Sequence, residues 1–183
     1  MFDTTDETLI TRALTGNKRA WGQLLSRYEK PVYLYGVRMT SNREDAKDLM
    51  QDVFISVYRN LGQYQGTGKF KSWLFKIAHY RCIEFYRRKK PLQSIDDTLE
   101  IADSHASPDM CYAGDAQQQT LLLAMQSLPI AQREVVELKF FGQFTFVEIA
   151  EQLHVSPNTV KARLYSALAK LKDNSEVQYA YSR

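Results

Sequence analysis

Hydrophobic residues recur at intervals of three and four along most of the chain, which is the periodicity of amphipathic helices. The pattern predicts helices at about residues 6–14, 17–39, 43–61 and 69–90, and then at 115–127, 129–141, 145–153 and 156–172. Pro31 lies inside the second segment and is expected to interrupt or kink that helix. Residues 1–90 show no strand pattern. The sequence therefore predicts an all-α protein.

The helical periodicity is lost between the two groups of helices. Residues 91–116 contain Ser, Asp, Pro and Gly without a sustained pattern, and no Lys or Arg occurs from residue 91 to residue 132. Such a segment is typical of a flexible linker. We therefore expect two small helical domains, residues 1–90 and 117–173, joined by a flexible acidic linker at 91–116 and followed by a polar tail at 174–183. Two separate domains fit this pattern better than one compact body.

Residues 145–172 have the pattern of two short helices joined by a tight turn. Thr145 and Glu148 have the spacing of a capping box, and Ser156 followed by Pro157 is typical of a helix start. The second helix carries small polar and aromatic side chains opposite its hydrophobic stripe, with cations at the edges, a combination suited to bases and phosphates of DNA. These candidate DNA contacts are Ser156, Asn158, Thr159, Lys161, Ala162, Arg163, Tyr165 and Ser166. An amphipathic hairpin with a solvated charged face is the alternative.

Cations and aromatic residues share one face of the helix expected at residues 69–90. The set comprises Lys69, Lys76, Tyr80 and Arg87, with Trp73 at its margin and Tyr64 in the preceding loop. Such a face suits a helix that follows the backbone of single-stranded or opened DNA and stacks on its bases. Packing against a neighbouring helix is the alternative, and it is the better interpretation for Trp73 taken alone.

Three carboxylates line one side of the helix expected at residues 43–61. Asp45, Asp48 and Asp52 are spaced at i, i+3 and i+7, beside the apolar stripe. A basic partner could dock on this row. The spacing alone fits a solvated helix face equally well, which is the commoner fate of helical charges.

The charge distribution is more informative than the total charge. The chain has 24 Lys and Arg against 21 Asp and Glu, for a formal net charge of +3. Residues 69–90 are strongly basic, whereas the linker that follows is acidic. This arrangement indicates a nucleic-acid surface beside a segment that should stay off it.

Residues typical of enzymes and metal sites do not form a recognisable motif. His79, His105 and His154 lie in three different contexts, and Cys82 and Cys111 lack metal-ligand spacing. Cys82 falls on an apolar helix face and is expected to be a buried free thiol. The polar N-terminus is no signal peptide, and no apolar run has membrane-spanning length. We expect a cytoplasmic protein without enzyme activity, metal, cofactor or membrane insertion.

Several segments resemble a known family when they are taken in order. Asp45–Phe54, Phe70–Ala78 and the Arg87-Arg88 pair resemble domain 2 of bacterial sigma factors of the sigma-70 family, and residues 128–136, 144–150 and 155–164 resemble domain 4. The resemblance covers about residues 10–90 and 117–172. Because no third domain lies between them, the chain is most similar to the extracytoplasmic-function (ECF, group 4) sigma factors.

This resemblance implies a dissociable subunit that binds core RNA polymerase, through its beta and beta-prime subunits, and gives it promoter choice. A clamp coiled coil on the largest polymerase subunit would contact Asp45, Asp48, Leu49, Gln51, Asp52 and Phe54. The minus-ten element would be recognised and melted by Tyr64, Lys69, Phe70, Trp73, Lys76, Tyr80, Arg87 and Arg88. The helix from Ser156 would read the minus-thirty-five element in the major groove. An anti-sigma factor is a further expected partner.

The chain departs from the family pattern at three positions. Tyr80 stands where relatives often carry Asn, and Glu84 stands where they often carry Asp, so the details of strand opening do not transfer. Ser166 stands where relatives often carry a basic residue, so the base preference does not transfer either.

A free-standing regulator is the competing hypothesis, because residues 117–173 also resemble the helix-turn-helix of response regulators. That hypothesis predicts an α/β receiver domain with a phosphorylatable aspartate at a strand end, for which residues 1–90 offer no strands.

Overall fold

A computed structural model describes residues 4–66, 68–89 and 116–173, and within these ranges every regular element is a helix. The N-terminal half contains α1 (Asp6–Leu14), α2 (Lys18–Thr40), α3 (Arg43–Asn60), the short 3₁₀ helix η1 (Leu61–Gln63) and α4 (Phe70–Lys89). The C-terminal half contains α6 (Ala116–Gln126), α7 (Ile130–Val136), the π-helical turn η2 (Glu137–Phe141), α8 (Phe146–Leu153) and α9 (Pro157–Asp173). The expected linker from residue 91 to residue 115, and the tail at 174–183, lie outside the described residues.

Side-chain caps fix where the N-terminal helices begin. The Asn17 side chain accepts a hydrogen bond from the backbone N–H of Ala20 at 3.0 Å, and Asn42 accepts from the first turn of α3. Ser41, in the left-handed conformation with φ 63°, ends α2 and lets the chain reverse into α3. Pro31 lies inside α2, which runs unbroken from Lys18 to Thr40, so the expected interruption does not occur.

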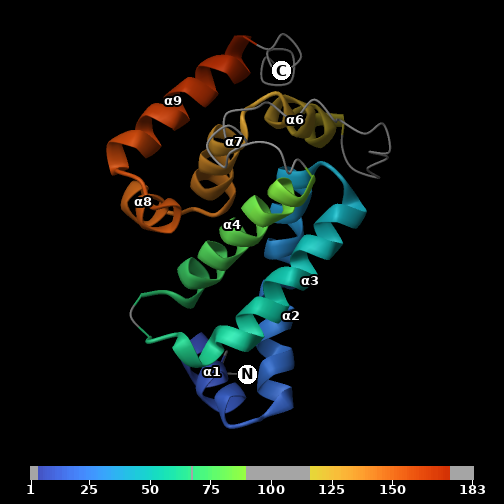
Figure 1. The fold of residues 1–183 in the computed structure, drawn as a ribbon, viewed down its shortest axis with the longest axis vertical. Coiled ribbons are helices and arrows are strands. Elements are labelled where there is room, and N and C mark those ends of the chain that lie inside the picture. Colours follow the sequence, from blue (N-terminus) through green and yellow to red (C-terminus); the bar gives the residue numbers. More distant parts are fainter. Residues whose placement is uncertain (1–3, 67, 90–115, 174–183) are drawn as a thin grey trace.

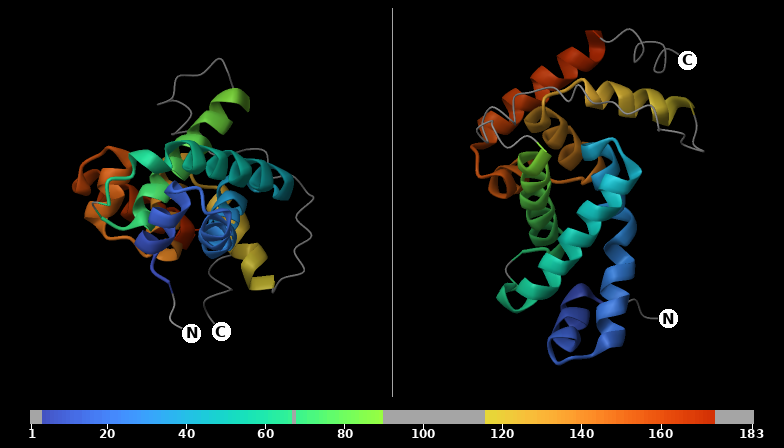
Figure 2. Two further views of the ribbon diagram at one scale, coloured as in Figure 1. Left: turned by 90° about the horizontal axis from the view of Figure 1, so that it is seen from below. Right: turned by 45° about the vertical axis from the view of Figure 1, so that its right-hand side comes forward.

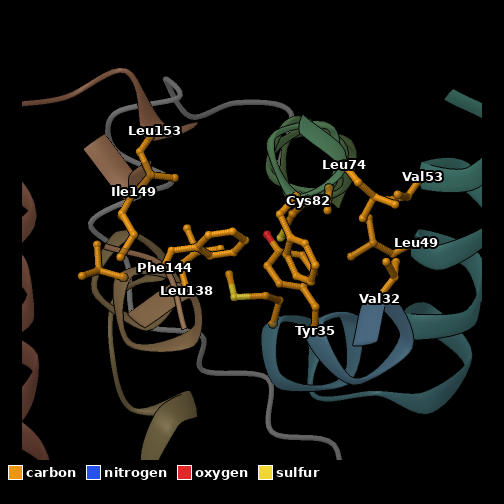
Figure 3. Packing of buried hydrophobic residues seen from close by; sticks show 14 of the residues in the cluster. Val32, Tyr35, Leu49, Val53, Leu74, Cys82, Leu138, Phe144, Ile149 and Leu153 are labelled. Carbon is orange, nitrogen blue, oxygen red and sulfur yellow. The ribbon is translucent and has the colours of Figure 1, made fainter. Parts of the chain in front are cut away.

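The long helices α2 and α3 run side by side in opposite directions and form the core of the N-terminal half with α4 (Figure 1). Val32, Leu49 and Leu74 meet between these three helices, as Figure 3 shows. Gly36 permits close approach, because a Cβ there would lie 3.0 Å from the carbonyl oxygen of Ala46 on α3. The packing therefore sets the position of the outer face of α3.

The expected helix-turn-helix is formed by α8 and α9. His154, in the left-handed conformation with φ 53°, ends α8 and turns the chain toward α9. The hydroxyl of Ser156 accepts from the backbone N–H of Thr159 at 3.0 Å, which caps the start of α9. Ile149 and Val160 pack inside the motif, so the opposite face of α9 is left outward.

The capping box of α8 carries a testable contribution to stability. Glu148 accepts from the backbone N–H of Thr145 at 2.7 Å, while Thr145 accepts from Glu148 N–H at 3.2 Å. Removing the hydroxyl in Thr145→Ala should cost about 1 kcal/mol of unfolding free energy in a urea titration. Val147→Ala, on the same helix and exposed, is the matched control and should change it far less.

The same box should weaken in acid. The hydrogen bond from the Thr145 backbone holds the pKa of Glu148 below its ordinary value, against a small opposing effect of burial. A carboxyl with a lowered pKa in the folded state stabilises the fold above its unfolded-state pKa and loses that contribution as pH falls through the folded-state value. The cost of Thr145→Ala should therefore shrink at low pH.

The two halves are the two expected domains, and they pack against each other, which the sequence pattern did not predict (Figures 1 and 2). Their buried residues form one continuous cluster. Figure 3 shows Leu138 and Phe144 of the C-terminal half facing Tyr35 and Cys82 of the N-terminal half. The rings of Phe75 and Phe144 lie 5.6 Å apart. Helix α4 is consequently buried on two sides.

Candidate functional site

The acidic residues of α3 differ in their surroundings. Asp48 is exposed, whereas Asp45 accepts a hydrogen bond from Lys89 Nζ at 2.6 Å and Asp52 pairs with Arg88 at 3.2 Å. The end of α4 therefore covers two of the three carboxylates that the sequence placed in one free row. Asp48 remains open to a partner.

The other expected polymerase contacts on α3 divide between surface and core. Gln51 is exposed and Phe54 is half-buried. Leu49 is only 2% exposed and packs in the core between α2, α3 and α4, because its side chain lies on the inner stripe of α3. Leu49 can support the surface from below, but it is not available for contact in this arrangement.

An apolar groove of about 1160 Å³ runs along the junction of α2 and α3. Its apolar lining residues are Trp21, Leu25, Met50, Phe54, Ile55 and Tyr58. The rings of Trp21 and Tyr58 lie 5.3 Å apart, and Gln51 also lines the groove. Sequence reasoning found Phe54 and Gln51 but missed the groove. Ile55 and Tyr58, two large apolar residues off the core stripe of α3, were the available signal.

The cationic and aromatic face of α4 is present in the structure. Tyr80 is 47% exposed and Arg87 is exposed, with Lys76 half-buried beside them. Arg88 lies away from this face, against Asp52 and Glu84, because the last turn of α4 leans on α3.

Aromatic packing orders the loop before α4. The hydroxyl of Tyr64 donates to the carbonyl of Gly68 at 2.8 Å, and its ring lies 5.5 Å from those of both Phe70 and Trp73. Phe70 is only 1% exposed and sits in the core against Tyr28, so it holds the loop rather than facing solvent. Trp73 is half-buried by the same cluster. The neighbour-packing alternative for Trp73 thus describes its place in this structure.

The C-terminal half covers the margin of this α4 face. Lys71 Nζ donates to the carbonyl of Gly142 at 2.7 Å, and the ring of Tyr80 lies 6.1 Å from that of His154. Burial, helped by the nearby charge of Lys69, lowers the pKa of Lys71. Cations on α4 are therefore partly enclosed by α8 and its flanking turns.

The outer face of α9 matches the expected set of contacts. Exposed on it are Asn158, Lys161, Ala162, Tyr165 and Ser166, and Tyr165 is 65% exposed. Ser156 and Thr159 share a hydrogen bond of 2.9 Å between their hydroxyls, so both are engaged at the helix start. Arg163 is half-buried and lies on the side of α9 nearer His79, whose pKa its charge lowers.

Sequence reasoning missed the buried polar residues between the two halves. Glu134 of α7, only 1% exposed, accepts from Tyr35 of α2 at 2.9 Å and lies 2.6 Å from Nδ1 of His79 on α4. Glu137 pairs with Arg38 of α2, with Nη2 and Oε1 2.7 Å apart. Nothing in the helical periodicity distinguishes these carboxylates from solvated charges.

Metal-binding and membrane-spanning features were also sought in the described ranges. No group of three or more His, Cys, Asp or Glu side chains there could hold a metal ion. None of the described helices is both long enough and apolar enough to cross a membrane.

Comparison with known proteins identifies both halves. The family model of Sigma-70 region 2 matches residues 24–91, and that of Sigma-70 region 4 matches residues 118–171. The RNA polymerase sigma-H factor of Pseudomonas aeruginosa is 30% identical over 88% of this chain and 89% of its own length. The chain belongs to the sigma-70 family. It is a sigma factor, which binds core RNA polymerase and directs promoter recognition, DNA melting and transcription initiation.

Other relatives place the sigma factor in the ECF group. The ECF RNA polymerase sigma factor SigW of Bacillus subtilis is 26% identical over 89% of this chain and 92% of its own length. Among solved structures, CnrH in complex with the cytosolic domain of CnrY has a TM-score of 0.69 at 23% identity, covering 97% of this chain and 99% of that chain. The sigma factor RpoE of Bartonella quintana, in complex with the anti-sigma factor NepR, also has a TM-score of 0.69, at 20% identity, over 89% of this chain and 98% of that chain. These structures share the fold.

Proposed function

We propose that the outer face of α3, together with the apolar groove beside it, is the surface that binds core polymerase. The groove offers Trp21, Ile55 and Tyr58 to apolar side chains of a partner helix, while Asp48 and Gln51 at α3 offer a carboxylate and an amide. A helix with an apolar stripe and flanking cations fits such a surface. The clamp coiled coil of the beta-prime subunit is the proposed occupant, as the family resemblance implies.

The second part of the proposal assigns the α4 face to the minus-ten element. Tyr80 and the loop residue Tyr64 would stack on unpaired bases, and Lys69, Lys76 and Arg87 would lie against phosphates. Each base stacked on an aromatic ring contributes about 1–3 kcal/mol, which favours capture of an opened strand without ATP. Trp73 would join this set after a small change in its packing with Tyr64.

The third part assigns the exposed face of α9 to the minus-thirty-five element. Asn158, Ala162, Tyr165 and Ser166 would face base edges in the major groove, and Lys161 and Arg163 would contact phosphates. The support is that a capped, well-packed helix presents these side chains outward from a helix-turn-helix.

The remaining assignments follow from the same proposal. Residues 1–90 would serve polymerase and minus-ten binding, residues 117–173 minus-thirty-five binding, with a linker at 91–116 and a tail at 174–183. The sigma factor would act in the cytoplasm as an initiation factor rather than a catalyst. An anti-sigma factor is a proposed partner, supported by the anti-sigma complexes of the structurally similar CnrH and RpoE.

The observation that carries these assignments is the exposure, on three separate helices, of an apolar and acidic groove, an aromatic and cationic face, and a capped recognition helix. Gel filtration with and without bacterial core polymerase, followed by run-off transcription on genomic fragments, tests them. Co-elution and discrete new transcripts are expected. Sequence-specific DNA binding by the chain alone, without co-elution, would instead mean a free-standing regulator.

Binding to the upstream element identified by run-off transcription should depend on the two cations of α9. Changing both Lys161 and Arg163 to alanine removes two phosphate contacts, so the slope of log K against log salt should become shallower by about 1.8. Fluorescence anisotropy of the holoenzyme on labelled promoter DNA at several salt concentrations measures this slope. Lys18→Ala with Arg19→Ala, two exposed cations on α2, is the matched control. An unchanged slope in the α9 variant would contradict the phosphate contacts.

A further inference from the structure

The interface between the two halves is built around two buried carboxylates of the C-terminal half. Glu134 meets the hydroxyl of Tyr35 and the ring of His79, and these two partners come from different helices of the N-terminal half. Because one carboxylate oxygen, Oε1, accepts both contacts, Glu134 ties α7 to α2 and α4 at a single point.

A second set of contacts continues the interface one helical turn further along. Arg38 pairs with Glu137 and also lies over the ring of Phe141, 4.1 Å from its centroid. Arg133 donates through Nη1 to the carbonyl oxygen of Met39 at 2.7 Å. The last turns of α2 are thus held by α7 and the π turn η2.

Such an interface is suited to separation. Interfaces between domains of one chain are commonly polar, and motion across them is the general expectation. Buried ion pairs contribute little net stability, because the desolvation of both charges opposes their attraction. When the halves part, the carboxylates of Glu134 and Glu137 regain water and lose little. The contacts fix one geometry without making it permanent.

We propose that this interface is an autoinhibitory latch: the contacts of Glu134 and Glu137 with α2 and α4 hold the free sigma factor closed, in a form unable to engage both promoter elements. The proposal rests on the assignment of α4 and α9 to the two elements. Those elements are centred about 25 base pairs apart, which is about 85 Å along B-DNA at 3.4 Å per base pair.

The closed geometry conflicts with that separation. Tyr80 of the minus-ten face lies with its ring 6.1 Å from His154, which directly precedes the turn into α9. The same packing encloses Lys71 against the carbonyl of Gly142. If fully extended, residues 90–115 would reach about 90 Å, so the covalent chain permits the two helices to part by the required distance.

The latch should be stronger in mild acid. Burial lowers the pKa of His79, but the charge and hydrogen bond of Glu134 raise it more, so the net shift is upward. The groups facing the pair are Tyr35 from α2, Lys76 from α4 and Arg163 from α9. Glu137 has its pKa raised as well, because burial outweighs its pairing with Arg38.

Both shifts have the same sign. A group whose pKa is raised in the closed form makes that form bind more protons, so closure is favoured at low pH and loses this contribution as pH rises through the raised value. For His79 this window lies above its ordinary pKa of about 6.5. The open fraction should therefore grow between about pH 6 and pH 8.5, and His79→Gln should remove most of that dependence.

Distance measurement on the free chain tests the latch directly. Spin labels at Lys69→Cys and Val147→Cys, both exposed, report the separation of α4 and α8 in a Cys82→Ala, Cys111→Ser background. The otherwise unaltered chain should give one short distance. Glu134→Gln with Glu137→Gln should raise the long-distance fraction about tenfold. Glu151→Gln with Asp173→Asn, two exposed carboxylates of the same half, should leave it unchanged.

A variant in the other half keeps the test independent of damage to the C-terminal half. Arg38→Gln removes the partner of Glu137 from α2 and should also open the chain. Circular dichroism should show the same helix content in all variants. Equal distance distributions in the latch variants and the controls would overturn the proposal, and so would an unaltered chain that is already open.

Affinity for core polymerase separates the latch from the proposed function. A binding-competent form that is only fractionally populated weakens the apparent affinity by that fraction, so unlabelled latch variants should bind core polymerase more tightly by about the factor that they open. Open variants with unchanged affinity would overturn the inhibitory role while leaving polymerase binding intact. Absence of binding by every variant would overturn the proposed function, and the distances would still decide whether the chain is latched.

Discussion

Binding of core polymerase should fall about 100-fold or more when Asp48 and Asp52 are both changed to arginine. The double variant places two cations where the proposed partner carries its own cations, and like-charge contacts across an interface cost several kcal/mol. The fold should survive, because Asp48 is exposed and the Asp52–Arg88 pair is a surface ion pair, worth about 0–1 kcal/mol. Gel filtration and a fluorescence titration with core polymerase measure the effect.

The control for this variant keeps the charge change and moves its position. Glu7→Arg with Glu151→Arg reverses two exposed carboxylates on α1 and α8, away from the groove, and should bind core polymerase as the unaltered chain does. Equal binding by both double variants would refute the docking surface on α3.

Arg133→Met should have the largest effect on stability, with a loss of about 3–5 kcal/mol of unfolding free energy. The guanidinium is 0% exposed and donates to four backbone carbonyls. These belong to Met39, Met125, Gln126 and Leu128. A thioether of similar length supplies no donor, so oxygens at the ends of α2 and α6 would stay buried without this partner.

Urea unfolding followed by circular dichroism measures this loss. Arg133→Lys should recover only part of it, because a single ammonium lacks the planar fork that reaches several carbonyls at once. Arg19→Met, an exposed arginine on α2, is the control and should lie within about 0.5 kcal/mol of the unaltered chain. A loss for Arg133→Met no greater than that of the control would contradict the role of these hydrogen bonds.

Most helix boundaries could be predicted from the sequence, because each begins at a residue with a local physical preference. Asn17, Asn42, Thr145 and Ser156 all cap the helices that were expected at them. Such caps act within one turn, so neighbouring residues suffice to find them. Pro31 was misjudged, because packing of the flanking Tyr28, Val32 and Tyr35 in the core holds α2 together across the missing donor.

Features that depend on distant contacts could not be predicted in this way. Periodicity assigns one buried stripe to a helix, whereas α4 buries Phe75 and Tyr86 as well, since a second set of helices covers it. The segment at 129–141 was expected to be one helix, and the structure changes to a π turn at Glu137–Phe141. Hydrophobic spacing does not reveal that one wider turn.

The candidate surfaces were predicted in part for the same reason. The outward face of α9 follows from its own sequence, so its exposed contacts were found. The groove between α2 and α3 needs two helices to form, and Trp21 and Tyr58 therefore gave no sign of it separately. Buried Glu134 and Glu137 resemble solvated charges until their partners on α2 and α4 are known.

The position of Cys82 gives the sigma factor a built-in chemical reporter. Its thiol is buried beneath the junction of the two halves, where burial and the charge of Glu134 raise its pKa and keep it protonated. Since the thiolate is the reactive form, alkylating reagents and oxidants should act on Cys82 slowly while the halves stay together. The rate at which iodoacetamide modifies this one residue would then count openings of the native chain, without any label.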